Sequence, residues 1–161
     1  MQLPKLTSAS ENTVLVPRRI LVPIDFSECS LRALEYASDL ARALGARLIL
    51  LHVAEPAMYG QNPVEVSPAT EDVNQNLISK NRERLAALGQ ARISYCAPDQ
   101  ILVRLGHAHS EITQTATALG ADLIVLGTHG HTRSKPQFLG SAAERVVRHA
   151  GCPVLTVREK A

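Results

Sequence analysis

The sequence predicts an α/β fold: a doubly wound parallel sheet of five strands in a single domain, with helices on both faces. Three observations favour this fold class. Five short apolar runs of strand length alternate with segments whose apolar residues recur at helical spacing. Glycine or proline follows most of these segments, where the chain has to turn. The length of 161 residues suits one domain.

Composition narrows the functional classes. Apolar residues make up 45% of the chain and charged residues 20%, which is typical of a folded core. Aromatic residues make up only 3% and the net charge is +2, so we expect no nucleic acid partner. The apolar runs are too short for a membrane span, and the first residues lack a signal-peptide core, so we expect a cytoplasmic protein without a membrane partner. Three widely spaced cysteines fit buried thiols in a reducing compartment: Cys29, Cys96 and Cys152.

The first predicted strand and helix follow a polar start. Residues 1–17 show no clear period and are expected to form a flexible N-terminal extension to a domain over 18–158. The run 19–24 is a buried strand, and Pro23 places its end because proline cannot donate to a ladder. Ser27 is then a candidate N-cap for a helix that Gly45 ends.

The middle of the chain gives a strand, a long loop and a helix. Residues 46–53 form a second buried strand, which Glu55-Pro56 stops. The stretch 57–69 is irregular, as lids and mobile segments often are. Thr70 is expected to cap the second helix and Gly89 to close it.

The second half completes the alternation. A third strand is favoured over 100–105, with 93–95 as a shorter alternative. A helix, a strand, a helix and a strand follow, over 110–119, 121–126, 141–150 and 154–157. Right-handed crossovers between parallel strands make the order 3-2-1-4-5 the natural one. The first and fourth strands then flank the switch point, where ligands bind in such sheets.

A spaced glycine motif follows the fourth strand. Gly127 and Gly130 lie three positions apart, and nine residues then lead to Gly140-Ser141. A strand, a loop and a helix start in this order bring backbone amides and a helix dipole to one place, which favours phosphate. Gly130 is expected to adopt positive φ, and Ser141 to cap the helix in a box with Glu144. The plainer alternative is a set of turn glycines and an ordinary cap.

Asp25 follows the first strand, on the other side of the same switch point. Its carboxylate could accept hydrogen bonds from a ligand there. The alternative is an aspartate that caps the following helix. Because Asp25 and Gly127 are expected to face one crevice, the two positions support each other as parts of a site. A P-loop motif and a dinucleotide-binding motif are both absent from the sequence.

Together these residues resemble the universal stress protein family. The motifs that carry the resemblance are Val22-Pro-Ile-Asp25, Leu51-His-Val53, residues 120–130, the spacing Gly127-x2-Gly130-x9-Gly140-Ser141, and residues 141–154. The similarity covers residues 18–158, and the glycine spacing is the signature of the ATP-binding branch of the family. The resemblance implies bound ATP at the strand ends, with a divalent cation, Mg²⁺ or Mn²⁺, among its phosphates.

The family also implies a role for each position that matches its motif. Asp25 and the backbone of Val53, beside Pro23, would hold the adenosine half. Leu126 and Gly127 would line the ribose. The phosphates would be held by Gly130, Gly140, Ser141 and the amide of Ala142.

The family resemblance favours an ATP-binding regulatory protein over two alternatives. One is a slow ATPase or phosphotransferase, and the other is a nucleotide-free dimeric scaffold. The loop between the glycines carries Arg133 where the family commonly has glycine, and Pro136 restricts it further, which mildly favours the scaffold. A homodimer through strand 154–157 is expected from the family, since that apolar edge would otherwise lie exposed.

Overall fold

The computed structural model describes residues 16–55, 68–93, 98, 100–130 and 139–158. Its strands form one parallel sheet in the order β3-β2-β1-β4-β5, which confirms the predicted fold and strand order. The strands are β1 (Arg19–Pro23), β2 (Arg47–Ala54), β3 (Gln100–Leu105), β4 (Leu123–Gly127) and β5 (Val154–Val157). Most of the expected N-terminal extension and of the loop 57–69 lies outside the described residues, as do 94–95 of the alternative strand.

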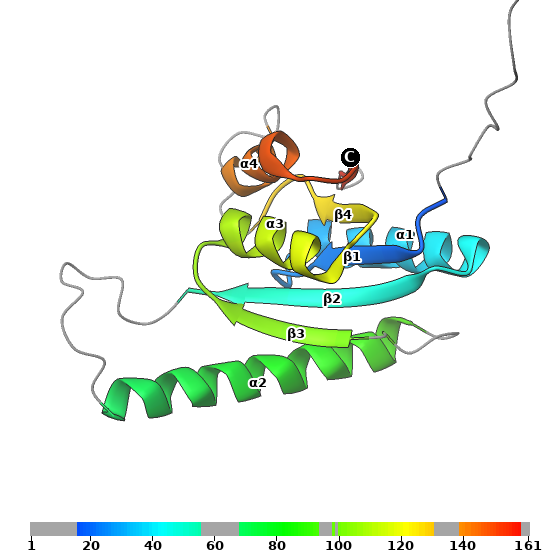
Figure 1. The fold of residues 1–161 in the computed structure, drawn as a ribbon. Helices are drawn as coiled ribbons and strands as arrows, with labels where there is room; N and C mark the ends of the chain where they lie inside the picture. The colour runs from blue at the N-terminus through cyan, green and yellow to red at the C-terminus, as the bar shows by residue number, and fades with distance from the viewer. Residues whose placement is uncertain (1–15, 56–67, 94–97, 99, 131–138, 159–161) are drawn as a thin grey trace, which may run out of the picture.

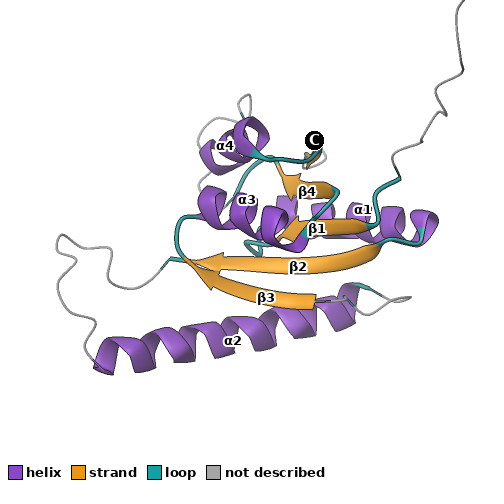
Figure 2. Ribbon diagram, viewed as in Figure 1, coloured by secondary structure: helices purple, strands orange, loops and turns teal. Residues whose placement is uncertain are grey.

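Helices cover both faces of the sheet (Figures 1 and 2). They are α1 (Glu28–Leu44), α2 (Pro68–Arg92), α3 (Ala108–Leu119) and α4 (Ser141–His149). Helices α1 and α2 pack on one face, where their apolar side chains join alternate residues of β1 and β2. Helices α3 and α4 pack on the other face against the remaining strand residues. Helices on both faces were expected, because the predicted strands are continuous apolar runs, which are typical of strands buried on both faces.

The ends of α1 are as predicted. Ser27 is the N-cap, with extended backbone and a hydroxyl that accepts a hydrogen bond from the amide of Ser30. Gly45 ends the helix in the left-handed conformation, at φ 64°, and its N–H donates to the carbonyl of Ala41. These caps fix where the chain leaves β1 and therefore where Asp25 lies.

The predicted ends of α2 were wrong. The helix begins at Pro68 rather than after Thr70, because proline is well suited to a first helical position. Gly89 does not close it; the helix continues to Arg92. Gly89 is buried instead, and a Cβ there would lie 3.4 Å from Pro98 and 3.5 Å from Leu50. Other predicted boundaries shift by one or two residues, and α3 begins at Ala108 rather than Ser110.

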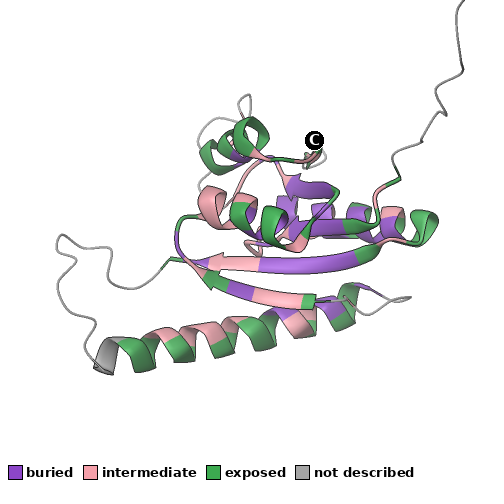
Figure 3. Ribbon diagram, viewed as in Figure 1, coloured by how far each residue is buried: buried purple, intermediate pink, exposed green. Residues whose placement is uncertain are grey.

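Strand β1 lies at the centre of the sheet and fixes the position of the site. Leu21 pairs with Ile49 of β2 and with Ile124 of β4, and its side chain is fully buried. Figure 3 shows β1 as largely buried. After β1 the chain turns to α1 on one face, whereas after β4 it leads to α4 on the other. The carboxyl ends of β1 and β4 therefore diverge and leave room between them. Within the described ranges, no helix is long and apolar enough to cross a bilayer.

Candidate functional site

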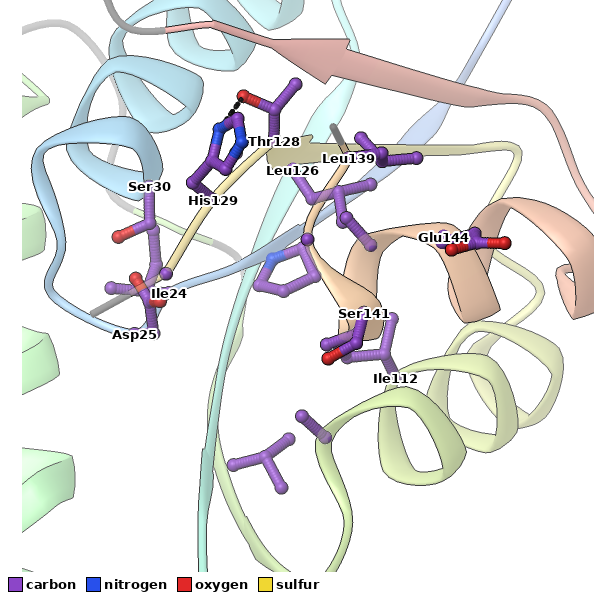
Figure 4. A pocket seen from close by; sticks show the side chains of 18 of the residues that line it. Ile24, Asp25, Ser30, Ile112, Leu126, Thr128, His129, Leu139, Ser141 and Glu144 are labelled. Carbon is purple, nitrogen blue, oxygen red and sulfur yellow. Dashed lines mark hydrogen bonds between the residues drawn. The ribbon is translucent and has the colours of Figure 1, made fainter. Parts of the chain in front are cut away.

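A pocket of about 550 Å³ opens at the carboxyl ends of β1, β2 and β4, beside the start of α4. Figure 4 shows Asp25 and Ser30 on one side of it and Ser141 and Ile112 on the other. All nine positions proposed from the sequence line this pocket: Pro23, Asp25, Val53, Leu126, Gly127, Gly130, Gly140, Ser141 and Ala142. The volume lies within the range of small-molecule sites. The fold thus brings together segments that are far apart in the sequence.

The carboxylate of Asp25 is oriented by the residue two positions later. Its Oδ1 accepts hydrogen bonds from the amide of Ser27 at 2.9 Å and from the hydroxyl of Ser27 at 2.5 Å. The same serine caps α1, so the aspartate does support the helix start, as the plainer alternative held. It also lines the pocket. A carboxylate has about four acceptor positions, so the two roles are compatible.

Two glycines of the motif allow close backbone approach. A Cβ at Gly127 would lie 2.8 Å from the carbonyl carbon of Cys29, in the first turn of α1. A Cβ at Gly140 would lie 2.9 Å from the carbonyl oxygen of Thr128, which accepts the Gly140 N–H at 2.8 Å. Gly140 therefore enters α4 packed closely against Thr128. At Gly127, the position that a side chain would take is occupied by the first turn of α1, so no ligand can lie on that side of the residue.

The expected positive φ at Gly130 is wrong. Among the described glycines, positive φ occurs at Gly45, Gly106 and Gly120. Gly130 is constrained by a neighbour instead, because a Cβ there would lie 2.5 Å from Oδ2 of Asp25. The second glycine of the motif therefore makes room for the carboxylate that follows β1.

The predicted capping box at Ser141 is also wrong. The N-cap of α4 is Gly140, and Ser141 is the first helical residue, without a side-chain capping bond. Glu144 pairs with Arg148 at 2.8 Å instead of reaching back. The first intrahelical bond runs from the Glu144 amide to Gly140, so the amides of residues 141–143 precede it. All three of these residues line the pocket, which places the positive end of the helix dipole there.

The pocket has further lining residues that sequence reasoning did not single out. Its apolar part comes from both faces of the fold: Ile24, Leu51, Ala108, Ile112, Leu139 and Ala143. In the sequence these residues look like ordinary core positions, because neighbouring residues in the chain do not indicate which core side chains border a cavity. The polar additions are Ser30, Thr128 and His129. His129 has its Nδ1 2.9 Å from the Thr128 hydroxyl, while its Nε2 is buried without a partner (Figure 4).

The charged side chains in the described lining are all acidic. They are Asp25, Glu55 and Glu144. Arg133 and Lys135, which could reach an anion, lie outside the described residues. Where the structure describes the chain, it contains no group of three histidine, cysteine or acidic residues that could hold a metal ion. Among the described lining residues, the groups available to an anion are therefore backbone amides and not side-chain cations.

Comparisons with known proteins show what the whole chain resembles. A model of the Universal stress protein family matches residues 17–158. Universal stress protein MJ0531 of Methanocaldococcus jannaschii is 30% identical over 154 residues, which cover 96% of this chain and 89% of the relative.

Two solved structures extend the comparison. The structure of protein MJ0577 from the same organism has a TM-score of 0.77 at 26% identity, and covers 91% of this chain and 99% of its own. A universal stress protein solved in complex with cAMP has a TM-score of 0.56 at 25% identity, with 88% and 97% covered. The similarity to solved structures and the match to the family model thus agree with each other.

Proposed function

We propose that this chain, which belongs to the universal stress protein family, binds ATP with a divalent cation and acts as a regulatory protein. The observation that carries the proposal is the convergence of all nine expected positions on one pocket. Support also comes from the relative solved in complex with cAMP, because it shows that this fold can accommodate an adenine nucleotide. In a regulatory protein, the nucleotide state would alter stability or partner binding.

The strand ends suit the adenosine half of the ligand. Pro23 and Val53 offer apolar surface, and Asp25 offers acceptors for hydroxyl or amine groups. Because Ser27 donates two hydrogen bonds to Asp25, the carboxylate is held before a ligand arrives. Such preorganisation reduces the entropy that binding must overcome.

The start of α4 suits the phosphates. The amides of Ser141 and Ala142 precede the first intrahelical bond, and the helix dipole adds a partial positive charge. Since Glu55 and Glu144 line the same pocket, a triphosphate would be repelled unless its charge were reduced. A Mg²⁺ or Mn²⁺ ion held mainly by phosphate oxygens and water would do this, and it needs no protein cage.

Nucleotide release is the experiment that tests the proposal. Purified protein is denatured with acid, and the released compounds are identified by chromatography. Thermal melts with and without Mg-ATP accompany it, and a hundredfold excess over Kd should add about 2.7 kcal/mol of stability. Release of nothing, together with an unchanged melt at millimolar Mg-ATP, would contradict the proposal and favour the nucleotide-free scaffold.

A regulatory role is proposed in preference to catalysis. Rapid phosphoryl transfer needs a positioned base and cationic groups around the γ-phosphate. Glu144, at the start of α4, is engaged with Arg148 in an ion pair. We therefore expect hydrolysis far slower than about 1 s⁻¹, the lower end for kinases. Turnover above that rate, measured as phosphate release, would reverse this preference.

We also propose a homodimer that forms through β5. This strand is at the edge of the sheet, and its residues Val154, Leu155 and Val157 are half-buried. Proteins tend to cover such edges, because unpaired backbone groups invite pairing. Light scattering at micromolar concentration should report twice the chain mass. Cytoplasmic location stays a prediction.

A further inference from the structure

Phe26 has an unusual backbone for a bulky residue. Among the described residues it is the non-glycine position with positive φ, at 64°. Such a conformation is strained for a side chain of this size and persists only where surrounding contacts hold it. Phe26 lies between Asp25, which lines the pocket, and Ser27, which orients the Asp25 carboxylate. The strain is thus located within the turn that carries the carboxylate.

Two side chains from other elements hold the ring of Phe26. The ring of His52, on β2, has its centroid 4.8 Å away at an interplanar angle of 51°. The guanidinium carbon of Arg84, on α2, lies 3.7 Å from the centroid of the Phe26 ring, which is cation–π geometry. His52 also places Nδ1 2.7 Å from the carbonyl oxygen of Ile24, so this nitrogen donates to the residue before Asp25. The backbone is therefore held on both sides of Asp25.

These three side chains do not belong to the pocket lining. Phe26 packs against the core cluster on the α1 and α2 face of the sheet. The neighbouring Asp25 belongs to the pocket, whose far side is formed by α3 and α4. Asp25 and Phe26 thus reach opposite sides of the turn, with Phe26 in the positive-φ conformation. Glycine would allow the same φ, but it would supply no ring for His52 and Arg84 to hold.

We propose that Phe26, clamped by Arg84 and His52, is a positioning residue that sets the Asp25 carboxylate for the ligand and so couples α2 to the pocket. The inference rests on the proposed nucleotide site. Loss of the clamp lets Phe26 relax toward negative φ. That relaxation turns Asp25 and breaks its hydrogen bonds with Ser27. The Ser27 amide is therefore a reporter of the clamp that needs no nucleotide.

The test uses the full chain and two clamp variants. Arg84→Met removes the cation from an exposed helix position while keeping the length of the side chain, and Phe26→Leu removes the ring. Arg84→Lys keeps a cation and Phe26→Tyr keeps a ring, so both should behave like the wild type. Arg82→Met makes the same change at another exposed arginine of α2, and serves as the matched control.

Two readouts are taken on each variant. In the ligand-free protein, the ¹H–¹⁵N resonance of the Ser27 amide should move in both clamp variants and not in Arg82→Met. Mg-ATP affinity should fall about tenfold in the clamp variants, the loss expected when one hydrogen bond to a charged group is misaligned. An unmoved Ser27 resonance in folded Arg84→Met would overturn the inference. If the wild type binds no ATP, the proposed function fails, and the Ser27 resonance still decides the positioning role.

Discussion

The α-carbon of Gly130 lies so close to Asp25 that a methyl group added to it would be 2.5 Å from the carboxylate oxygen Oδ2. The two residues lie just after different strands, β1 and β4, and they meet because these strands are neighbours in the sheet. The second glycine of the motif thus lies directly against the Asp25 carboxylate. From this contact we predict how a substitution at either residue changes the affinity for Mg-ATP.

Gly130→Ala should weaken Mg-ATP binding about tenfold or more, because the carboxylate has to move away from its hydrogen bonds with Ser27. Isothermal titration measures the affinity, and a melt shows whether the fold is kept. The matched control is Gly151→Ala, where an added Cβ meets nothing within 4 Å. Equal affinity in both variants would show that the Asp25 position does not matter for the ligand.

Asp25→Asn should also reduce Mg-ATP affinity, by about ten- to a hundredfold, because a neutral amide accepts hydrogen bonds less strongly than a carboxylate. Asp122→Asn makes the same change just before β4, at the opposite end of the strands, where the carboxylate accepts hydrogen bonds from the amides of Arg18 and Arg19 at 2.9 Å. The control should lower stability and leave affinity unchanged. A similar affinity loss in both variants would indicate general destabilisation rather than a contact.

Gly127→Ala should destabilise the fold rather than act only on binding. Its Cβ would lie 2.8 Å from backbone and side-chain atoms of Cys29, and neither helix nor strand can move freely there. Overpacking of this kind costs about 1–3 kcal/mol. Chemical denaturation without nucleotide measures the difference. A free energy of unfolding equal to that of the wild type would mean that α1 shifts at little cost.

The sequence was sufficient to predict the sheet and the position of the pocket. Buried strands such as β1 appear as continuous apolar runs, and the crossover rule then orders them without further information. Asp25 and Gly127 were predicted to meet for the same reason, since both follow strands that flank the switch point. These features depend on periodicity and topology, which a sequence carries over long stretches.

Local reasons for individual residues were harder to predict. Gly130 and Gly89 are constrained by neighbours that are distant in sequence, whereas the sequence offered only turn and helix-end explanations. Ser141 suited an N-cap by type, but the N-cap is Gly140, whose N–H donates to the Thr128 carbonyl, and Ser141 is already the first helical residue. Phe26 gave no signal, because positive φ is unusual for phenylalanine and is imposed by tertiary contacts.

Stability should fall as the pH falls below 6.5, in part because of His109 on α3. The pKa of His109 is lowered from its ordinary 6.5, first by loss of hydration and then by the positive charges of Arg145, His107 and His149. The unfolded chain therefore binds this proton more tightly than the folded chain does. Stability is fully present above 6.5 and declines as the pH falls toward the folded pKa.

NMR titration and melts test this pH dependence. Arg145→Gln should raise the pKa of His109 toward 6.5, because it removes a neighbouring positive charge. His109→Gln should flatten the fall in melting temperature between pH 7 and pH 5. Because His109 is only partly buried, solvent screens its interactions and we expect a small effect. A wild-type His109 that titrates at or above 6.5 would contradict the prediction.

The free edge of β5 can be tested at a single residue. The Ile124 amide donates to the carbonyl of Pro153 and the Thr128 amide donates to the carbonyl of Val157, both at 3.0 Å. Alternate residues of β5 thus face β4, and Thr156, between them, directs its backbone N–H and carbonyl to the open edge. Its side chain is exposed, so a change there leaves the core intact.

Thr156→Pro should therefore raise the dimer dissociation constant about tenfold or more, because it removes an edge donor and adds a ring that obstructs pairing. Thr156→Val keeps the N–H and the strand preference, so it should dimerise like the wild type. Sedimentation at several concentrations measures both constants, and a melt of the diluted chains shows that each folds. An unchanged constant for folded Thr156→Pro would mean that the chains associate through another surface, since a strand edge cannot pair normally around a proline at that position.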